Sequence, residues 1–367
     1  MGGLFRHVCD LSVEQSRRGH LVGVVCDAAV GDALTEARIA ALEPHLALGL
    51  RRTPMSRDLG LSDIGAYAFT RHLAESLGID VIHGHGAKGG AYSRLVARAM
   101  KRSGVRLVSC YTPHGGSLHY HPATLQGAIY MRLERWLARA TDALVFESAY
   151  SADRYAAQVG APACLARVIP NGLGPEDFAA IEPADGAADF LFVGELRRLK
   201  GVDVMLAALA RVRQQRPASA VIVGSGPDAA AFQAETARLR LGDIVSFRHP
   251  IPARAAFALG RAMVVPSRAE SFPYIVLEAA AAAVPMLASN VGGIPQIVAG
   301  TDTVLLPPQD DAALAEAMLA VLGDPAAAKA RALRLREEVG RRFTVAAMTD
   351  AVLDLYDAAC MQVTRRA

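Results

Sequence analysis

Short apolar runs alternate with longer amphipathic stretches along the whole chain. The runs are rich in Val, Ile, Leu and Phe, and they predict strands at 21–26, 80–84, 105–111, 142–147, 166–170, 189–195, 220–226, 244–248, 262–267 and 285–289. The stretches between them are rich in Ala, Leu and Arg, and they predict helices such as 63–77, 88–102, 123–139, 200–215, 228–240 and 311–323. Strands that alternate with helices in this way form parallel sheets covered on both faces. We therefore predict an α/β fold.

One segment interrupts this alternation. Residues 171–189 hold Gly, Pro and acidic residues without apolar periodicity, which is typical of a connection between domains. A chain of 367 residues also fits two domains of about 150–200 residues each. We predict two Rossmann-like, doubly wound domains at 1–172 and 189–343, a linker at 173–188, and a C-terminal helix at 344–363 that packs back on the first domain. The apolar positions of that helix have helical spacing: Val345, Met348, Val352, Leu355 and Ala359.

Composition excludes several classes of protein. Hydrophobic residues make up 52% and charged residues 20% of the chain, so it folds as a globule rather than staying disordered. A net charge of +3 and 6% aromatic residues give no case for nucleic acid as a partner. Residues 1–172 hold 19 Lys and Arg against 14 Asp and Glu, a mild basic bias that suits an anionic lipid surface or solvated helix faces.

Cysteines and apolar runs indicate the compartment. The five cysteines are scattered, odd in number and never in a C-x-x-C pair, which argues against a disulfide framework or a zinc ribbon. No apolar run approaches the roughly 20 residues that span a bilayer, and the first residues lack the pattern of a secretory leader. The expected location is the cytoplasm, with the inner face of the membrane as a contact surface.

Two patterns in the first half carry weak signals. Gly84, Gly86 and Gly89 match the dinucleotide fingerprint as a string, but the acidic residue required about 20 positions later is missing, which favours a glycine-rich turn. The pairs at 83/85 and 119/121 place histidines at the spacing of metal ligands. Because no Asp, Glu or Cys lies beside either pair, we predict no metal site.

His114 differs from the other histidines. It lies directly after the predicted strand at 105–111, between Pro113 and Gly115. Open α/β sheets bind their ligands at the carboxyl ends of their strands. His114 is therefore a candidate site residue, with a structural histidine as the alternative.

The second half holds a candidate diphosphate site. The strand at 189–195 leads through Gly194 to Arg197, Arg198 and Lys200, at the start of a helix. Glycine allows close approach of the backbone, the helix start offers unpaired amides, and the cations add charge-assisted contacts. The alternative is a solvated basic helix start.

Two glutamates follow the strand at 262–267. Pro273 suits the first turn of a helix, which places Glu270 just before that helix and Glu278 in its second turn. The two carboxylates would then address different parts of one elongated ligand, Glu270 the hydroxyls of a sugar and Glu278 a ribose diol. Free amides of the first turn, near Tyr274 and Ile275, suit a phosphate.

These strings together resemble a known family. GELRRLKG (194–201), VIVGSGP (221–227) and ESFPYIVLE (270–278), with NGL at 171–173, are similar to the retaining glycosyltransferases of family 4, which have the GT-B fold of two Rossmann-like domains facing a cleft. PMSR (54–57), DVIHGHGAKGG (80–90), YTPHG (111–115) and DALVFES (142–148) are similar to the first domain of that family.

The resemblance implies an activity and a set of site residues. It implies transfer of a sugar from a nucleotide diphosphate sugar, with retention of anomeric configuration, to a sugar or lipid-linked acceptor in cell-surface polysaccharide or glycolipid assembly. No metal or cofactor is expected. Lys200 and either Arg197 or Arg198 would bind the diphosphate, Glu270 the donor sugar, and Glu278 the ribose, with His114 near the sugar and the acceptor. The expected catalytic residues are His114, Lys200 and Glu270; the expected donor-binding residues are Gly2, Gly3, Gly194, Arg197, Arg198, Gly224, Gly226, Ser271, Phe272, Tyr274, Ile275 and Glu278.

Three departures from the family keep other functions open. Glu195 stands where many relatives have arginine, and Pro273 where glycine is common. The sequence also opens directly at Gly2 and Gly3, without the central strand that precedes this glycine pair in relatives, so we expect the true start to lie upstream. The alternatives are a GT-B binding or regulatory protein with little turnover, and a GT-B sugar-nucleotide epimerase.

Overall fold

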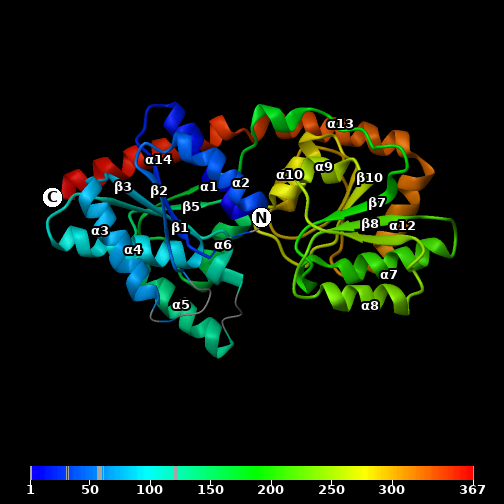
Figure 1. The fold of residues 1–367 in the computed structure, drawn as a ribbon, viewed down its shortest axis with the longest axis horizontal. Helices are drawn as coiled ribbons and strands as arrows, with labels where there is room; N and C mark the ends of the chain where they lie inside the picture. Colours follow the sequence, from blue (N-terminus) through cyan, green and yellow to red (C-terminus); the bar gives the residue numbers. More distant parts are fainter. Residues whose placement is uncertain are drawn as a thin grey trace. The chain divides into compact units, whose positions relative to one another are not determined.

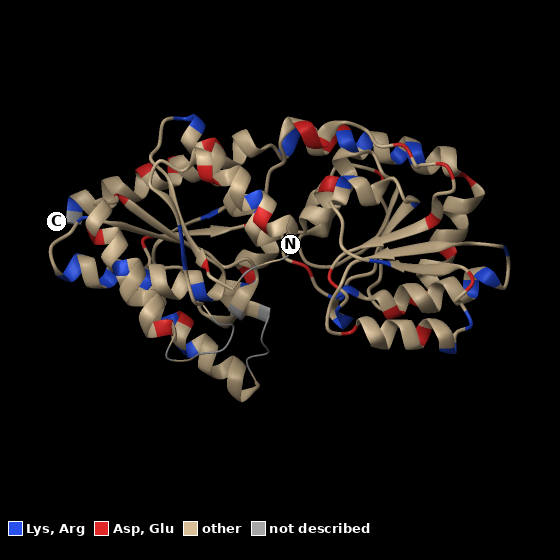
Figure 2. Cartoon of the chain, viewed as in Figure 1, with Lys and Arg blue, Asp and Glu red and all other residues tan. Residues whose placement is uncertain are grey.

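The computed structural model describes residues 2–29, 31, 33–55, 60, 62–119 and 123–366. The chain forms two compact units, which Figure 1 shows in sequence colours. Unit 1 is Met1–Gly172 together with Val345–Ala367, and unit 2 is Leu173–Thr344. In both units Lys, Arg, Asp and Glu are spread over helices and loops, whereas the strands are mostly uncharged (Figure 2).

Unit 2 is built on one parallel sheet of six strands in the order β12-β11-β10-β7-β8-β9. Its strands are β7 (Ala188–Val193), β8 (Ala220–Val223), β9 (Val245–Arg248), β10 (Gly260–Val265), β11 (Met286–Ser289) and β12 (Leu305–Leu306). Its helices are η3 (Pro175–Phe178), η4 (Arg198–Lys200), α7 (Val202–Arg213), α8 (Ala229–Arg238), α9 (Ala253–Phe257), α10 (Tyr274–Ala281), α11 (Ile294–Val298), α12 (Asp311–Gly323) and α13 (Pro325–Arg342).

Both faces of this sheet are buried. Helices α9, α10, α11 and α13 cover one face, and α7, α8 and α12 cover the other (Figure 1). Phe190 and Leu191, which point to opposite faces of β7, have no exposed surface. Burial on both faces explains why the strands read as continuous apolar runs instead of alternating patterns.

The strands of unit 1 form two parallel sheets. One pairs β1 (Gly23–Asp27) with β2 (Gly49–Thr53). The other has the order β3 (Val81–His85), β4 (Val108–Thr112), β5 (Ala143–Phe146) and β6 (Leu165–Val168). Among the described residues no strand joins β1 to β3, so the two sheets are separate.

The helices of unit 1 include one from the far end of the chain. They are α1 (Gly3–Arg17), α2 (Ala33–Leu42), η1 (Glu43–His45), α3 (Ser62–Leu77), α4 (Gly86–Arg102), η2 (Gly116–His119), α5 (Leu125–Ala138), α6 (Ala149–Gln158) and α14 (Val345–Arg366). Val352 and Leu355 of α14 are fully buried against Val108 and Val145 of the sheet. The C-terminal helix therefore completes the core of unit 1.

A buried ionic network fastens α4 to α5. The Arg94 side chain is fully buried, and its Nη1 donates to Glu134 Oε2 at 2.8 Å. Its guanidinium lies 3.9 Å from the centre of the Tyr111 ring, and the Tyr111 hydroxyl donates to Glu134 Oε1 at 3.1 Å. Each charge thus has a partner inside the core.

The segment 173–188 lies on unit 2. Leu173 forms a parallel bridge with Thr344, and its amide donates to the carbonyl of Phe343 at 3.0 Å. Farther along, the amide of Ile181 donates to the carbonyl of Ala282 at 3.0 Å. Residues 173–188, the predicted linker, therefore form a packed connection.

Every predicted strand is present in the structure, with ends that agree within a few residues. The predicted strands are β1 and β3 to β11. Two strands were missed. β2 has the sequence GLRRT, whose two arginines break the apolar run, and β12 is only two residues long. The α/β class is confirmed. Of the quoted family strings, part of PMSR (Ser56 and Arg57) lies outside the described residues.

Candidate active site

Lys200 and Glu270 form a close ion pair in unit 2. Lys200 ends η4, and Gly201, in the left-handed conformation at φ 73°, starts the turn into α7. The Lys200 ammonium donates to Glu270 Oε1 at 2.7 Å and to Oε2 at 2.9 Å. The Ser267 hydroxyl donates to Oε1 at 2.7 Å. The sequence predicted both residues as parts of one site but did not predict that they bind each other.

This pairing leaves capacity for a ligand. An ammonium group has three N–H donors, and Glu270 takes two of those of Lys200. The Lys200 side chain keeps 26% of its surface exposed, whereas that of Glu270 keeps 8%. A third donor can therefore reach a phosphate oxygen while Glu270 stays paired.

Glycines let the loops around this pair approach one another closely. A Cβ atom at Gly201 would lie 1.9 Å from the Pro266 carbonyl oxygen, and one at Gly292 would lie 1.7 Å from that of Glu270. At Gly224 it would lie 1.9 Å from the carbonyl oxygen of Gly194. The loops after β7, β8, β10 and β11 can therefore meet only because these positions lack side chains.

The same contacts refine the prediction for two donor-site glycines. Gly224 packs on Gly194, and a Cβ atom at Gly226 would lie 2.5 Å from the carbonyl oxygen of Leu196. Both glycines thus have a packing role that is independent of any ligand. Their contact with a donor stays a prediction.

The basic turn at Arg197 and Arg198 is fixed through its backbone. The Arg198 amide donates to Asp228 Oδ2 at 2.6 Å, and its carbonyl accepts from Arg268 Nη1 at 2.5 Å. Both arginine side chains are exposed. The turn is therefore held in place while its two cations stay available to an anion in solution.

Sequence reasoning missed Arg268 as the residue that fixes this turn. Arg268 also binds both carboxylate oxygens of Asp203, at 2.8 and 2.7 Å. Burial alone would raise the pKa of Asp203. The hydrogen bonds and the charge of Arg268 lower this pKa by more, so the net shift is downward. The signal in the sequence was the position of Arg268 shortly after the end of β10, where ligands and loop contacts gather in parallel sheets.

The helix α10 carries the second glutamate. It begins at Tyr274, and Pro273 is its N-cap residue, one position earlier than the first turn that the sequence suggested. Glu278 lies in the second turn, as predicted, and is partly exposed together with Ser271 and Ile275. The side chains of Phe272 and Tyr274, however, are buried in the core of unit 2. Any contact of these two residues with a donor would be through their backbone.

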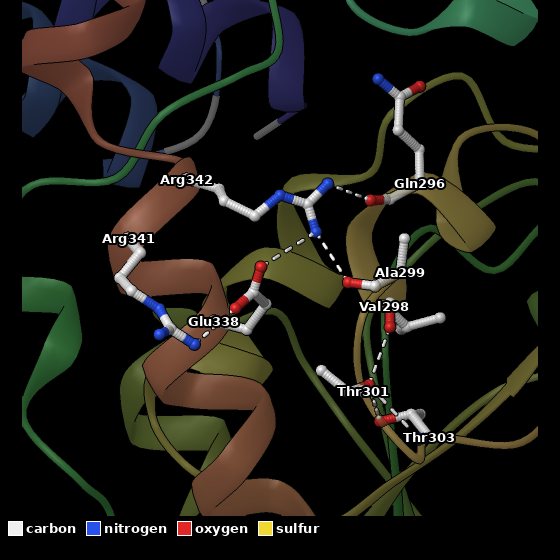
Figure 3. Close-up of polar contacts among 8 residues, drawn as sticks. All are labelled: Gln296, Val298, Ala299, Thr301, Thr303, Glu338, Arg341 and Arg342. Atoms are coloured by element: carbon white, nitrogen blue, oxygen red, sulfur yellow. Dashed lines mark hydrogen bonds and ion pairs between the residues drawn. The ribbon is translucent and has the colours of Figure 1, made fainter.

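An arginine at the end of α13 holds α11 beside this region. Figure 3 shows the Arg342 guanidinium donating to the carbonyl oxygens of Gln296 and Ala299, at 2.9 and 2.8 Å. These carbonyls belong to the end of α11, where helical partners run out. Arg342 therefore fixes α11, the helix that follows the loop of Gly292.

His114 lies in unit 1, directly after β4. Its backbone is left-handed, with φ 50°, which is uncommon for a residue other than glycine. Its Nδ1 lies 3.0 Å from Glu147 Oε1, beyond the end of β5, and its Nε2 lies 3.1 Å from Nδ1 of His85. The parallel sheet therefore brings the ends of β3, β4 and β5 together around this imidazole.

Two more histidines surround His114. Nδ1 of His7, in α1, lies 2.9 Å from Asn171 Oδ1, and His83 contacts the hydroxyls of Tyr356 and Thr112 at 2.5 and 2.8 Å. Burial lowers the pKa of His83 to about 3. Burial, followed by repulsion from neighbouring histidines, lowers the pKa of His7 and of His85 well below the ordinary value. Sequence reasoning missed His7. In the pair at 119/121, His121 lies outside the described residues.

The predicted glycine loop at the start is instead the beginning of a helix. Gly2 is the N-cap residue of α1, and Gly3 is its first helical residue. Both are exposed. Their role in binding a diphosphate stays a prediction.

Comparisons with known proteins agree with this architecture. Residues 1–177 match the family described as Glycosyltransferase Family 4, and residues 187–324 match Glycosyl transferases group 1. A glycogen synthase from Mycobacterium tuberculosis is 32% identical over 98% of this chain and 92% of its own length. A D-inositol 3-phosphate glycosyltransferase from Saccharomonospora viridis is 28% identical over 97% of this chain and 89% of its own.

Solved structures share the fold. Anabaena HepE in complex with UDP-glucose superposes with a TM-score of 0.78 at 19% identity, covering 98% of this chain and 96% of its own. The sucrose-phosphate synthase of Thermosynechococcus elongatus gives a TM-score of 0.78 at 23% identity, over 100% and 94%. The chain belongs to glycosyltransferase family 4 and is a nucleotide-sugar glycosyltransferase with the GT-B fold.

Proposed function

We propose that the chain transfers a glucosyl group from a nucleoside diphosphate glucose to a hydroxyl acceptor, with retention of anomeric configuration. The pairing of Lys200 with the buried Glu270 carries this proposal, because it sets a cation with a spare donor next to an acceptor for sugar hydroxyls. Glucose is chosen because Anabaena HepE binds UDP-glucose and has the same fold.

The chemistry needs groups that stabilise a departing diphosphate. The bond from the anomeric carbon to the phosphate oxygen breaks, and the diphosphate leaves with the electron pair. The acceptor hydroxyl forms the new bond on the same face of the sugar, and its proton passes to the diphosphate. Lys200 and either Arg197 or Arg198 neutralise the growing negative charge, so they bind the transition state more tightly than the ground state.

The other predicted residues orient the donor. Glu270 accepts hydrogen bonds from sugar hydroxyls, and Glu278 accepts them from the ribose. Backbone amides at the start of α10 face the phosphate, because the positive end of the helix dipole attracts anions. His114 contacts the sugar or the acceptor.

A transfer assay with labelled donors tests the proposal. The full chain is incubated with UDP-glucose, ADP-glucose or GDP-mannose, with and without a lipid extract or an oligosaccharide. We expect labelled product and free nucleoside diphosphate only when donor and acceptor are both present. Conversion of the donor sugar without an acceptor would instead indicate an epimerase, and donor binding without any product would indicate a binding protein.

We also propose that the acceptor is carried on a lipid and that α5 contacts the membrane. Leu125, Ile129 and Trp136 follow one another at helical spacing on α5 and are 81%, 51% and 41% exposed. Arg132 and Arg139 are exposed along the same stripe. The only acidic residue of α5 is the buried Glu134, so the exposed charges of this helix are positive. No helix among the described residues is long and apolar enough to cross a membrane.

Vesicle binding checks this contact. The chain should bind vesicles of phosphatidylglycerol more tightly than vesicles of phosphatidylcholine, because each surface arginine contributes about 1 kcal/mol near an anionic lipid surface. Ile129→Glu should weaken binding at least tenfold in cosedimentation. The matched control is Leu333→Glu, which alters a residue of α13 with 42% exposure and should leave binding unchanged. Equal binding of both variants would contradict the proposal.

A further inference from the structure

Arg268 joins the two loops that carry Lys200 and Glu270. It follows β10 and lies two residues before Glu270 in the sequence. We infer that Arg268 is a positioning residue of the diphosphate site, which sets the place of the Lys200 ammonium group relative to Glu270. The inference rests on the proposed function and gives a role to a residue outside the site predicted from the sequence.

Arg268 holds the residues just before Lys200 through both its side chain and its backbone. Its Nη1 donates to the carbonyl oxygen of Arg198 at 2.5 Å. Its backbone amide donates to the carbonyl oxygen of Leu199 at 2.8 Å. Two consecutive carbonyls of η4 are therefore fixed by one residue of the neighbouring loop.

The same guanidinium also holds a residue that follows Lys200. Asp203, in the first turn of α7, accepts hydrogen bonds from Nη1 and Nη2 of Arg268 at 2.8 and 2.7 Å. Such two-point binding fixes the orientation of a carboxylate as well as its distance. Lys200 thus lies between two stretches of the chain that are both bound to Arg268.

Arg268 has little capacity left to bind a ligand itself. A guanidinium group has five N–H donors. Four of those of Arg268 are used, because its Nε also donates to Gln309 Oε1 at 3.2 Å. Asp203 balances its charge, and only 19% of its side chain is exposed. Arg268 therefore acts through Lys200 rather than on the donor.

The place of the Lys200 ammonium group matters because its charge must meet the departing diphosphate. Glu270 takes two of its donors, so the position of η4 decides where the third one points. A misplacement of about 1 Å can cost an active site about 100-fold in rate. Without Arg268, the turn that carries Lys200 would lose its anchors to the loop that carries Glu270.

Binding of nucleoside diphosphates tests the inference without an acceptor. The full chain is titrated by calorimetry with UDP, ADP and GDP, and the one that binds most tightly is used for the variants. Arg268→Met should raise its Kd about tenfold, because the charge-assisted contact from Lys200 is weakened. In the Lys200→Ala chain the same substitution should raise the Kd less than about twofold, since Arg268 acts through Lys200. Arg268→Lys should recover only part of the affinity, because an ammonium group lacks the fork that binds Asp203.

A matched variant and a measurement on the ligand-free chain complete the test. Arg334→Met removes another arginine of unit 2 that binds both carboxylate oxygens of an aspartate, Asp302, and it should leave the affinity unchanged. Hydrogen exchange should be faster at the amides of Lys200 and Gly201 in Arg268→Met but not in Arg334→Met, because these amides bond within the turn that Arg268 anchors.

The outcomes separate this inference from the proposed function. A wild-type chain that binds no nucleoside diphosphate would overturn the proposed function, and the inference with it. If the wild-type chain binds one, unchanged exchange in η4 would overturn the role of Arg268 alone. An equal loss of affinity with and without Lys200 would do the same. If Arg268→Met does not fold, Asp203→Asn weakens the same anchor and replaces it in both measurements, with the same expected direction.

Discussion

Replacing Lys200 by alanine is expected to lower kcat/KM for sugar transfer by about 10- to 100-fold. A hydrogen bond to a charged group contributes about 1.5–3 kcal/mol, and each 1.36 kcal/mol corresponds to a tenfold change in rate. The loss extends beyond one donor, because Glu270 accepts two hydrogen bonds from Lys200 and is only 7% exposed. Without the ammonium group, the negative charge of Glu270 is no longer balanced where the diphosphate should bind. Steady-state kinetics with the donor identified in the transfer assay measures the effect.

Controls separate this effect from a loss of folding. Lys329→Ala removes another lysine of unit 2, which pairs with the exposed Glu182, and should retain full activity. Glu270→Gln should itself be impaired, and the double variant Lys200→Ala/Glu270→Gln should lose less than the product of the two single losses, since the residues act as one unit. Transfer at nearly the wild-type rate by a folded Lys200→Ala protein would remove Lys200 from the site.

Breaking the buried ion pair of unit 1 should produce the largest loss of stability. Arg94→Ala leaves the buried Glu134 carboxylate without its cation, and removal of one partner of a buried ion pair typically costs about 3–5 kcal/mol. The Tyr111 ring also loses the guanidinium that covers it at 3.9 Å. The chain has one tryptophan, Trp136, two residues from Glu134 on α5. Tryptophan fluorescence during denaturant unfolding therefore reports on unit 1.

The companion variants make the cause explicit. Arg94→Met/Glu134→Leu replaces both charges by apolar groups and should recover most of the lost stability, because neither charge is then left alone. Arg102→Met changes an exposed arginine of the same helix α4 and should alter stability by less than about 0.5 kcal/mol. A double variant no more stable than Arg94→Ala would show that the cost comes from packing rather than from the unpaired carboxylate.

The sequence predicted the fold well because buried parallel strands leave a simple signal. Continuous apolar runs at 189–195 and 262–267 became β7 and β10 at the centre of the unit 2 sheet. β2 escaped because arginines at 51 and 52 interrupt it. One of them, Arg52, pairs with Glu36 at 2.7 Å, a partner from α2 that periodicity cannot reveal.

The site was predicted in its members but not in its contacts. Spacing placed Glu270 before α10 and Glu278 within it, yet nothing local shows that Lys200, 70 positions earlier, would bind Glu270. Phe272 and Tyr274 were predicted to bind the donor because they lie between the two glutamates in the sequence. Their side chains are instead buried in the core of unit 2. His7 was not predicted because its hydrogen-bond partner, Asn171, is 164 residues away in the sequence.

The route of the chain between its halves has a practical consequence. Unit 2 is an uninterrupted piece, and its first residue, Leu173, is bridged to its last, Thr344. Unit 2 is thus inserted into the sequence of unit 1 at one place. Deleting 173–344 would leave Gly172 and Val345 close enough for a short glycine linker to rejoin them. Ending the chain after Thr344 would instead remove α14, and with it part of the core of unit 1. Any attempt to study the first half in isolation must therefore carry the last helix with it.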